Sequence, residues 1–248
     1  MKLRITHISD THNKHKQLND KLPGGDILIH SGDISSLGRQ REVEGFVKWF
    51  NGVDGYTYKI FVAGNHDMSF DSEKLMQDKI NYFDPSKTVW ESEGIENEPA
   101  EGKPEWLNDL LATGLNPNVF YLENSYVELD QIKIWGSPYS AKFGYGWGFN
   151  VNRGYDSAQL WNQIPDDTDI VITHGPIYGY GDMTSNTYQN VGCEDLYRRL
   201  KQLGTPLHFA GHIHESYGIM DSPDTMFANA SILNERYELV NKPLEFFL

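Results

Sequence analysis

The sequence predicts an α/β fold, because short buried strands alternate with amphipathic helices along the chain. Five apolar runs have the length of strands and end in polar clusters: Leu3–Ile8, Asp26–His30, Tyr58–Ala63, Asp169–Thr173 and Leu207–Ala210. Such runs are typical of strands that are buried on both faces. Helical patterns lie between the early strands, and this alternation favours a sheet whose central part is mostly parallel.

Two helices are predicted from local patterns. Val43, Phe46, Val47 and Phe50 follow the spacing of one helical face, so they predict a helix with an apolar side. A later helix is expected over Glu194–Leu203, ending near Gly204.

Antiparallel strands are expected beside the parallel ones. Residues 119–135 alternate between polar and apolar side chains, and residues 217–248 contain short strand patterns with turns at 222–224 and 241–243. Residues 84–104 are rich in proline, glycine and acids, which indicates a surface excursion. No segment resembles a linker, so a single domain is expected over residues 1–248.

Composition restricts the class of protein. The chain has 248 residues, of which 39% are hydrophobic and 23% charged, so it can bury a core without cross-links. Its one cysteine, Cys193, excludes an internal disulfide and fits a reducing compartment. No apolar run is long enough to cross a bilayer, and the first residues are too polar for a secretory signal. We therefore expect a cytoplasmic protein.

The charge balance restricts the partners. The formal net charge is −14, so the chain repels anionic membranes and the phosphate backbone of long nucleic acid. The one dense basic cluster, Arg198, Arg199 and Lys201, is interpreted as the solvated face of a helix. Small substrates are therefore expected, without a membrane or a long nucleic acid as partner, and the oligomeric state is left open.

Polar residues concentrate where the five predicted strands end. The clusters are Ser9-Asp10-Thr11-His12, Ser31-Gly32-Asp33, Gly64-Asn65-His66-Asp67, His174-Gly175-Pro176 and Gly211-His212-Ile213-His214. In α/β folds, ligands bind at the carboxyl ends of the strands. If the five strands belong to one system of sheets, the clusters converge on one site.

The donor atoms in these clusters predict a metal site. They are two carboxylates, one amide oxygen and four imidazoles, from Asp10, Asp33, Asn65, His12, His174, His212 and His214. Mixed oxygen and nitrogen ligands suit divalent manganese, iron or zinc. Seven side chains are too many for one ion with an open position, but they suit two ions if a carboxylate bridges them. Asp33 is the natural bridge, because it stands alone between the other motifs.

Other histidines and aromatic residues have less specific interpretations. His7, His30 and His208 lie within predicted strands and are expected to be core residues, and His15 is expected in a loop. Trp147, Phe149 and Tyr178 lie in glycine-rich loops, where base stacking and plain loop packing are both open. Asn150 is a candidate to contact a phosphate or a ribose.

The set of motifs resembles that of the calcineurin-like metallophosphoesterases. The matching residues are Asp10-x-His12, Gly32-Asp33, Gly64-Asn65-His66-Asp67, His174-Gly175 and Gly211-His212-x-His214, spread over residues 10–214. Further segments resemble the class III cyclic-nucleotide phosphodiesterases and the metallophosphoesterase-domain-containing proteins of animals. These segments are Ala63-Gly64-Asn65-His66, Trp147-Gly148-Phe149-Asn150, Thr173-His174-Gly175-Pro176, Gly211-His212-Ile213-His214-Glu215 and Tyr217-Gly218.

The resemblance implies a fold and a function. The fold is a four-layer αββα sandwich with two mixed sheets. One metal ion takes Asp10, His12, Asp33 and His214, and the other takes Asp33, Asn65, His174 and His212. Two divalent ions are expected, manganese first, with iron or zinc as alternatives. A hydroxide that bridges them is the nucleophile, and His66 protonates the leaving alkoxide.

The expected activity is hydrolysis of phosphodiester bonds in small nucleotides. A protein serine/threonine phosphatase is disfavoured, because residues 32–38 lack the aspartate and arginine that such enzymes carry after Gly-Asp. A phosphomonoesterase, a nuclease of the same superfamily and a non-catalytic binding scaffold remain as alternatives. Trp147, Phe149, Asn150 and Tyr178 are the candidate substrate contacts.

Overall fold

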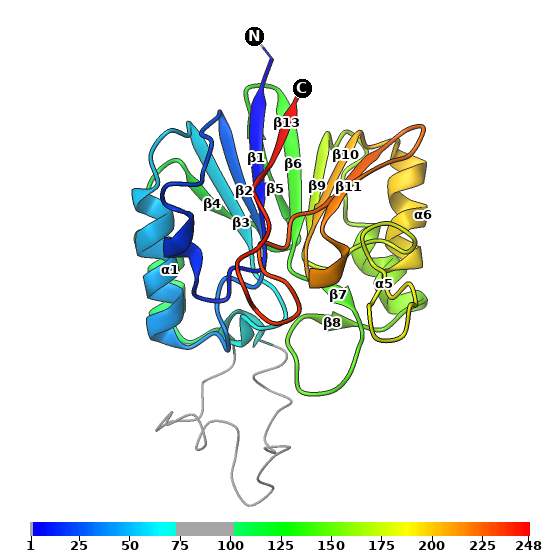
Figure 1. Cartoon of the computed structure of the whole chain (residues 1–248), viewed down its shortest axis with the longest axis horizontal. Coiled ribbons are helices and arrows are strands. Elements are labelled where there is room, and N and C mark those ends of the chain that lie inside the picture. Colours follow the sequence, from blue (N-terminus) through cyan, green and yellow to red (C-terminus); the bar gives the residue numbers. More distant parts are fainter. Residues whose placement is uncertain (1, 73–101) are drawn as a thin grey trace, which may run out of the picture.

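Two mixed β-sheets form the centre of the molecule, as a computed structural model of the chain shows (Figure 1). The structure describes residues 2–72 and 102–248. One sheet has five strands and the other six, and a two-stranded sheet lies beside them. The predicted α/β class is therefore confirmed.

The first sheet is parallel except at one edge. Its order is β13 (Leu244–Phe247), β1 (Arg4–Ile8), β2 (Ile27–Ser31), β3 (Tyr58–Val62) and β4 (Val119–Tyr121). Strands β1 to β4 run parallel, and β13 pairs with β1 in the antiparallel sense. The first three predicted strands thus lie side by side, and their carboxyl ends share one edge.

The second sheet is parallel at its centre and antiparallel at both edges. Its order is β11 (Gly218–Asp221), β12 (Met226–Asn229), β10 (Leu207–Ala210), β9 (Ile170–Thr173), β6 (Ile132–Ser137) and β5 (Ser125–Leu129). The antiparallel pairs are β11 with β12 and β5 with β6. The small parallel pair is β7 (Ser140–Ala141) with β8 (Asn150–Val151).

Helices lie outside both sheets. On one side are α1 (Gln40–Gly52) and α4 (Glu105–Thr113), and on the other α5 (Tyr155–Trp161) and α6 (Glu194–Leu203) (Figure 1). Short 3₁₀ helices are η1 (His15–Leu18), η2 (Met68–Phe70) and η3 (His214–Ser216). No helix within residues 2–72 and 102–248 combines the length and apolarity needed to cross a bilayer.

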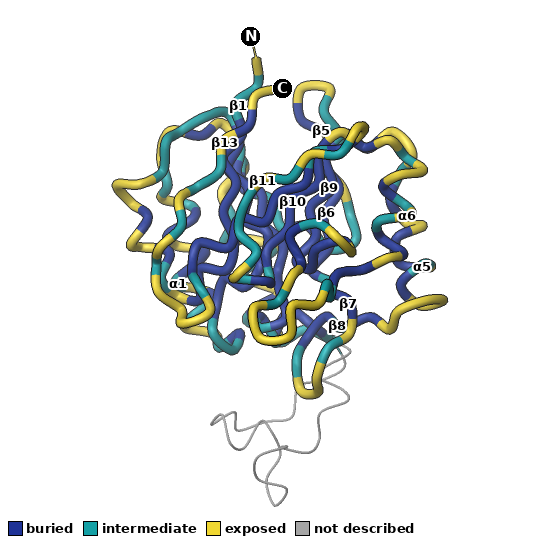
Figure 2. The backbone as a smooth tube through the Cα atoms, turned by 45° about the vertical axis from the view of Figure 1, so that its right-hand side comes forward, coloured by how far each residue is buried: buried dark blue, intermediate teal, exposed yellow. Residues whose placement is uncertain are grey.

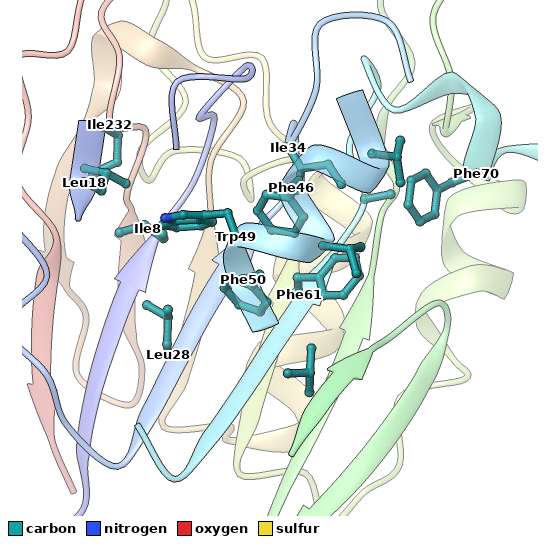
Figure 3. Close-up of a cluster of buried hydrophobic side chains, with 14 of the residues drawn as sticks. Ile8, Leu18, Leu28, Ile34, Phe46, Trp49, Phe50, Phe61, Phe70 and Ile232 are labelled. Carbon is teal, nitrogen blue, oxygen red and sulfur yellow. The ribbon is translucent and has the colours of Figure 1, made fainter. Parts of the chain in front are cut away.

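Three apolar layers hold these elements together. Helix α1 places Phe46, Trp49 and Phe50 against residues of the first sheet such as Leu28 and Phe61 (Figure 3). A second layer joins the two sheets, and a third lies between α5, α6 and the outer face of the second sheet. Buried backbone therefore concentrates in the sheets, while helix surfaces face solvent (Figure 2). This confirms the four-layer αββα sandwich.

Helix α6 illustrates how local sequence sets an element. It begins after Cys193, whose sulfur accepts a hydrogen bond from the amide of Leu196, and it ends at Leu203 as predicted. Gly204 follows with a φ of 65°, a left-handed conformation that glycine adopts without a steric penalty.

The structure departs from two expectations drawn from the sequence, and a third falls mostly outside the described residues. The strands predicted over residues 119–135 are antiparallel only for β5 with β6, because β4 pairs in parallel with β3. His15 is not a loop residue: it starts η1, and its ring packs on Phe46 and Trp49. Most of the excursion predicted over residues 84–104 lies outside the described residues.

Candidate metal centre

The predicted ligands and the predicted acid His66 lie in the turns that follow five strands. Asp10 and His12 follow β1, Asp33 follows β2, Asn65 and His66 follow β3, His174 follows β9, and His212 and His214 follow β10. An isolated bridge between Ser9 and Ser231 joins the ends of β1 and β12, and so links the two sheets at this edge. All the predicted ligands meet there, although they come from both sheets.

Donor atoms of these residues form three overlapping groups. Within each group one ligand atom per residue lies within 4.8 Å of the others, and the groups are Asp10–His12–His214, His12–Asp33–His66 and Asp33–His174–His212. Asn65 joins the third group, since its Oδ1 is 2.9 Å from His174 Nε2. His66 also lies close enough to His12 and Asp33 to share a metal ion with them, which the resemblance did not imply.

Asp33 is shared between the two halves of the site. Its Oδ2 is 3.6 Å from His12 Nε2 and 3.4 Å from His174 Nε2. On the far side, His214 Nε2 is 3.4 Å from Asp10 Oδ1. Two donor atoms that bind one divalent ion at about 2.1 Å lie about 3 to 3.5 Å apart, so these separations suit coordination.

The histidine rings are oriented by backbone carbonyl groups. Nδ1 of His12 lies 3.1 Å from the oxygen of Ser35, Nδ1 of His174 lies 3.0 Å from that of Ser31, and Nδ1 of His214 lies 2.9 Å from that of Asn234. A carbonyl can only accept, so each Nδ1 carries a proton, and in its neutral form each ring offers the Nε2 lone pair. This is the usual arrangement of metal-binding histidines.

The charges in the site call for cations. Asp10 and Asp33 are 0% and 2% exposed, and within the described part of the chain their ionic partners are histidines rather than lysine or arginine. Burial alone lowers the pKa of His174 and His214, but Asp33 and Asp10 outweigh it and raise each pKa to about 9. Without metal these rings hold protons; divalent ions replace protons in such sites.

The backbone bends sharply to present the ligands. Asp10, Asp33, His12 and His212 have φ values of 54°, 54°, 38° and 70°, which residues other than glycine rarely adopt. Hydrogen bonds hold two of these turns together, from the amide of Asp10 to Gly32 and from that of His12 to Asp33. Such strained residues gather at functional sites, where the surrounding fold maintains them.

Two glycines allow the close approach of the motifs. A Cβ on Gly64 would lie 2.3 Å from Asp33 Oδ1 and 2.8 Å from His174 Cε1. A Cβ on Gly211 would lie 2.2 Å from Asp10 Oδ2. Neither position has room for a side chain while the carboxylates keep their places.

Several supporting residues were missed at the sequence level. Asp67 accepts hydrogen bonds from the amides of Ile34, Ser35 and Gly64, and so ties the turn after β2 to the turn after β3. Its place beside Asn65 and His66 was the available signal. Burial and the charge of Asp33 raise the pKa of Asp67 to about 7.

A second support lies at the end of β12. The side-chain Nδ2 of Asn229, the last residue of β12, donates to the carbonyl oxygens of Gly211 and Ile213, and Ser231 Oγ donates to Asp10 Oδ2. These bonds fix the turn that carries His212 and His214. No local sequence pattern marks Asn229 and Ser231 as supports, because the groups that they bind follow other strands.

His66 lies at the edge of the cluster, under Trp147. Its amide donates to Asp33 Oδ1 at 2.9 Å, and its Nδ1 lies 2.8 Å from the carbonyl oxygen of Ser36. The ring of Trp147 covers it, with the centroids 4.2 Å apart. Of the four predicted substrate contacts, Trp147 is therefore the one that touches the cluster.

The other three candidates have different environments. Phe149 is 1% exposed, and its ring packs in the core rather than lying on the surface. The side chain of Asn150 donates to the carbonyls of Trp147 and Gly148 and accepts from the amide of Phe143, so it shapes the loop. Tyr178 is 42% exposed, and within the described residues it makes no contact with the cluster.

Comparisons with known proteins agree with this architecture. The chain is 39% identical over 245 residues to human metallophosphoesterase domain-containing protein 1, covering 97% of this chain and 69% of that protein. It is 34% identical to a UPF0046 protein of Caenorhabditis elegans, covering 98% of this chain and 59% of the relative.

Solved structures share the fold at low sequence identity. A phosphopantetheinyl hydrolase of Mycobacterium tuberculosis matches with a TM-score of 0.55 and 13% identity, over 94% of this chain and 90% of that one. TT1561 of Thermus thermophilus matches with a TM-score of 0.53 and 12% identity, over 93% and 90%. The family model for calcineurin-like phosphoesterases matches residues 3–216. The chain therefore belongs to the calcineurin-like phosphoesterase family, which implies a metal-dependent hydrolase of phosphoesters.

Proposed function

We propose that this protein is a phosphodiesterase that hydrolyses small nucleotides at a dinuclear metal centre. The observation that carries the proposal is the arrangement around Asp33: a buried carboxylate shared by two groups of histidines, with three rings held so that Nε2 faces the cluster. Such a site is built to hold more than one cation, and two cations suit an anionic diester.

The ligand residues divide into two sets. Asp10, His12 and His214 hold one ion together with Asp33. Asn65, His174 and His212 hold the other, again with Asp33. A pair of divalent ions, manganese first and iron or zinc as alternatives, supplies positive charge for the phosphoryl group and lowers the pKa of water.

His66 is proposed as the general acid. Its Nδ1–H is engaged by the carbonyl of Ser36, so Nε2 carries a proton only when the ring is an imidazolium. The proton then moves from Nε2 to the departing oxygen as the phosphoester bond breaks.

Small nucleotides are the proposed substrates. Trp147 is partly exposed beside His66 and offers a face on which a base can stack. The net charge of −14 disfavours long nucleic acid, which needs a positive surface along its backbone.

Hydrolysis assays with a controlled metal content test this function. The chelated protein is assayed with bis-nitrophenyl phosphate and with nitrophenyl phosphate, each with added Mn²⁺, Fe²⁺ or Zn²⁺, and then with 3′,5′- and 2′,3′-cyclic nucleotides. We expect metal-dependent turnover that is faster on the diesters. Faster turnover of the monoester would replace the proposal with a phosphomonoesterase, and no turnover with any metal would favour a scaffold.

A further inference from the structure

The segment after β12 forms a tight turn over the metal cluster. In residues 234–238 the amide of Tyr237 donates to the carbonyl of Asn234 at 2.8 Å, and Asn234 Oδ1 accepts from the amides of Arg236 and Glu238. Tyr237 has a φ of 58°, which a bulky residue rarely adopts. The turn therefore fixes the direction in which the Tyr237 side chain leaves the backbone.

Two anchors fasten this turn to the motifs that carry the ligands. The carbonyl of Asn234 accepts from Nδ1 of His214 at 2.9 Å. The carbonyl of Tyr237 accepts from Nζ of Lys14, two residues after His12. These backbone bonds hold Tyr237 in place relative to His12 and His214, in addition to the packing of its ring.

The ring of Tyr237 packs edge-on against two of the candidate ligands. Its centroid lies 4.9 Å from that of His12 and 5.3 Å from that of His214. The residue is nevertheless 42% exposed, so one side of the ring faces the solvent above the cluster. A group bound at the cluster on that side would touch it.

The hydroxyl of Tyr237 is available as a donor. Within residues 2–72 and 102–248 it makes no hydrogen bond to another group of the protein. A tyrosine hydroxyl carries its proton at neutral pH, so it can donate. Asp10 and Asp33 already accept hydrogen bonds from His212, Ser231 and His66. A bound oxyanion at the cluster is an acceptor that the free hydroxyl can serve.

We propose that Tyr237 is a substrate-binding residue whose hydroxyl donates a hydrogen bond to a phosphoryl oxygen at the metal cluster. This inference deepens the proposed function and rests on it for the identity of the bound group. Phe143 and Trp147 cover His212 and His66. Tyr237 packs on His12 and His214, so three aromatic rings lie against four histidines of the cluster.

The test separates metal binding from phosphate binding. Mn²⁺ and then inorganic phosphate are titrated calorimetrically into the wild type, Tyr237→Phe and the control Tyr155→Phe, which alters a 78% exposed tyrosine on α5. Tyr237→Phe keeps the ring over His12 and His214, so its Mn²⁺ affinity should stay within about twofold. Its phosphate affinity should fall about tenfold or more, the cost of losing a hydrogen bond to a charged group.

Kinetics provide a second readout. On bis-nitrophenyl phosphate, Tyr237→Phe should raise KM with kcat nearly unchanged, because the bond is made to ground state and transition state alike. Unchanged phosphate affinity in Tyr237→Phe, or no phosphate binding by the wild type, would overturn the inference. A parallel loss of Mn²⁺ affinity would also overturn it, since Tyr237 would then act only on the ligands. A wild type that binds phosphate but hydrolyses nothing would defeat the proposed function and leave this comparison intact.

Discussion

The backbone amide of His212 donates to both carboxylate oxygens of Asp10, at 3.1 and 3.0 Å. The two residues are 202 positions apart in the chain, and they follow strands of different sheets. The backbone of His212, one predicted ligand, thus holds the carboxylate of Asp10, another predicted ligand. Gly211 makes this possible, because a side chain there would occupy the space of the Asp10 carboxylate.

Asp33→Ala should remove metal and activity together. Asp33 is the residue shared by two of the ligand groups, so both halves of the site lose a donor. We expect Mn²⁺ to raise the Tm of the wild type, because it binds the folded state, and to leave the Tm of the variant unchanged. Metal content per chain is measured by elemental analysis, with the exposed Asp221→Ala as control. A variant that still holds two ions would refute the shared role.

His66→Ala should reveal the leaving group's need for a proton. Loss of a general acid costs about 10²- to 10⁴-fold in kcat when the leaving oxygen is a poor one, as in an alkyl ester. Nitrophenolate leaves without a proton, so the same variant should lose far less on nitrophenyl esters. Equal losses on both substrates, or loss of bound metal in this variant, would instead assign His66 to metal binding, consistent with its distance from His12 and Asp33.

Gly64→Ala should disrupt the site by steric overlap alone. The added Cβ would lie 2.3 Å from Asp33 Oδ1 and 2.5 Å from the backbone nitrogen of Asp33. We expect unfolding free energy to fall by about 1–3 kcal/mol and Mn²⁺ affinity to fall more than tenfold. The matched control is Gly45→Ala in α1, where nothing lies within 4 Å; it should add about 1 kcal/mol and leave Mn²⁺ affinity unchanged. Wild-type Mn²⁺ affinity in Gly64→Ala would contradict the packing argument.

The free energy of unfolding should fall as the pH drops below about 6.5. Burial lowers the pKa of His30 and His208 to about 3, so in this range the unfolded chain binds protons that the folded chain does not. Each histidine then costs up to about 1.4 kcal/mol per pH unit. The measurement is urea unfolding of the chelated protein from pH 7 to pH 4.

A single substitution isolates one of these histidines. Thr173 Oγ1 donates to the carbonyl of Gly175, so His208 Nε2–H donates to Thr173. His208→Gln places an amide donor at a similar position and removes the titration. Its stability should depend less steeply on pH than that of the wild type, and an identical slope would show that His208 does not contribute.

Local sequence was sufficient to predict those features that depend only on neighbouring residues. Helix α6 ends at Leu203 before Gly204 as expected, and the apolar stripe of α1 faces the core. His7, His30 and His208 are buried core residues that hydrogen-bond to Ser31, Thr11 and Thr173. Local patterns were not sufficient for β4, whose partner β3 is distant in the chain, or for Phe149, whose burial depends on Tyr139 and other residues brought together by folding.

The sequence by itself determined which residue types follow each strand, and a carboxyl end of a strand is where a ligand site forms in such folds. Only the tertiary structure decided which ligand atoms lie together in one group and that His66 comes close to Asp33. It also decided that Tyr237 lies against His12 and His214. The reason is physical: spacing along the chain fixes the direction of a side chain within one strand or helix. The distance between residues some 200 positions apart depends instead on how two sheets pack and on turns whose hydrogen bonds come from other strands.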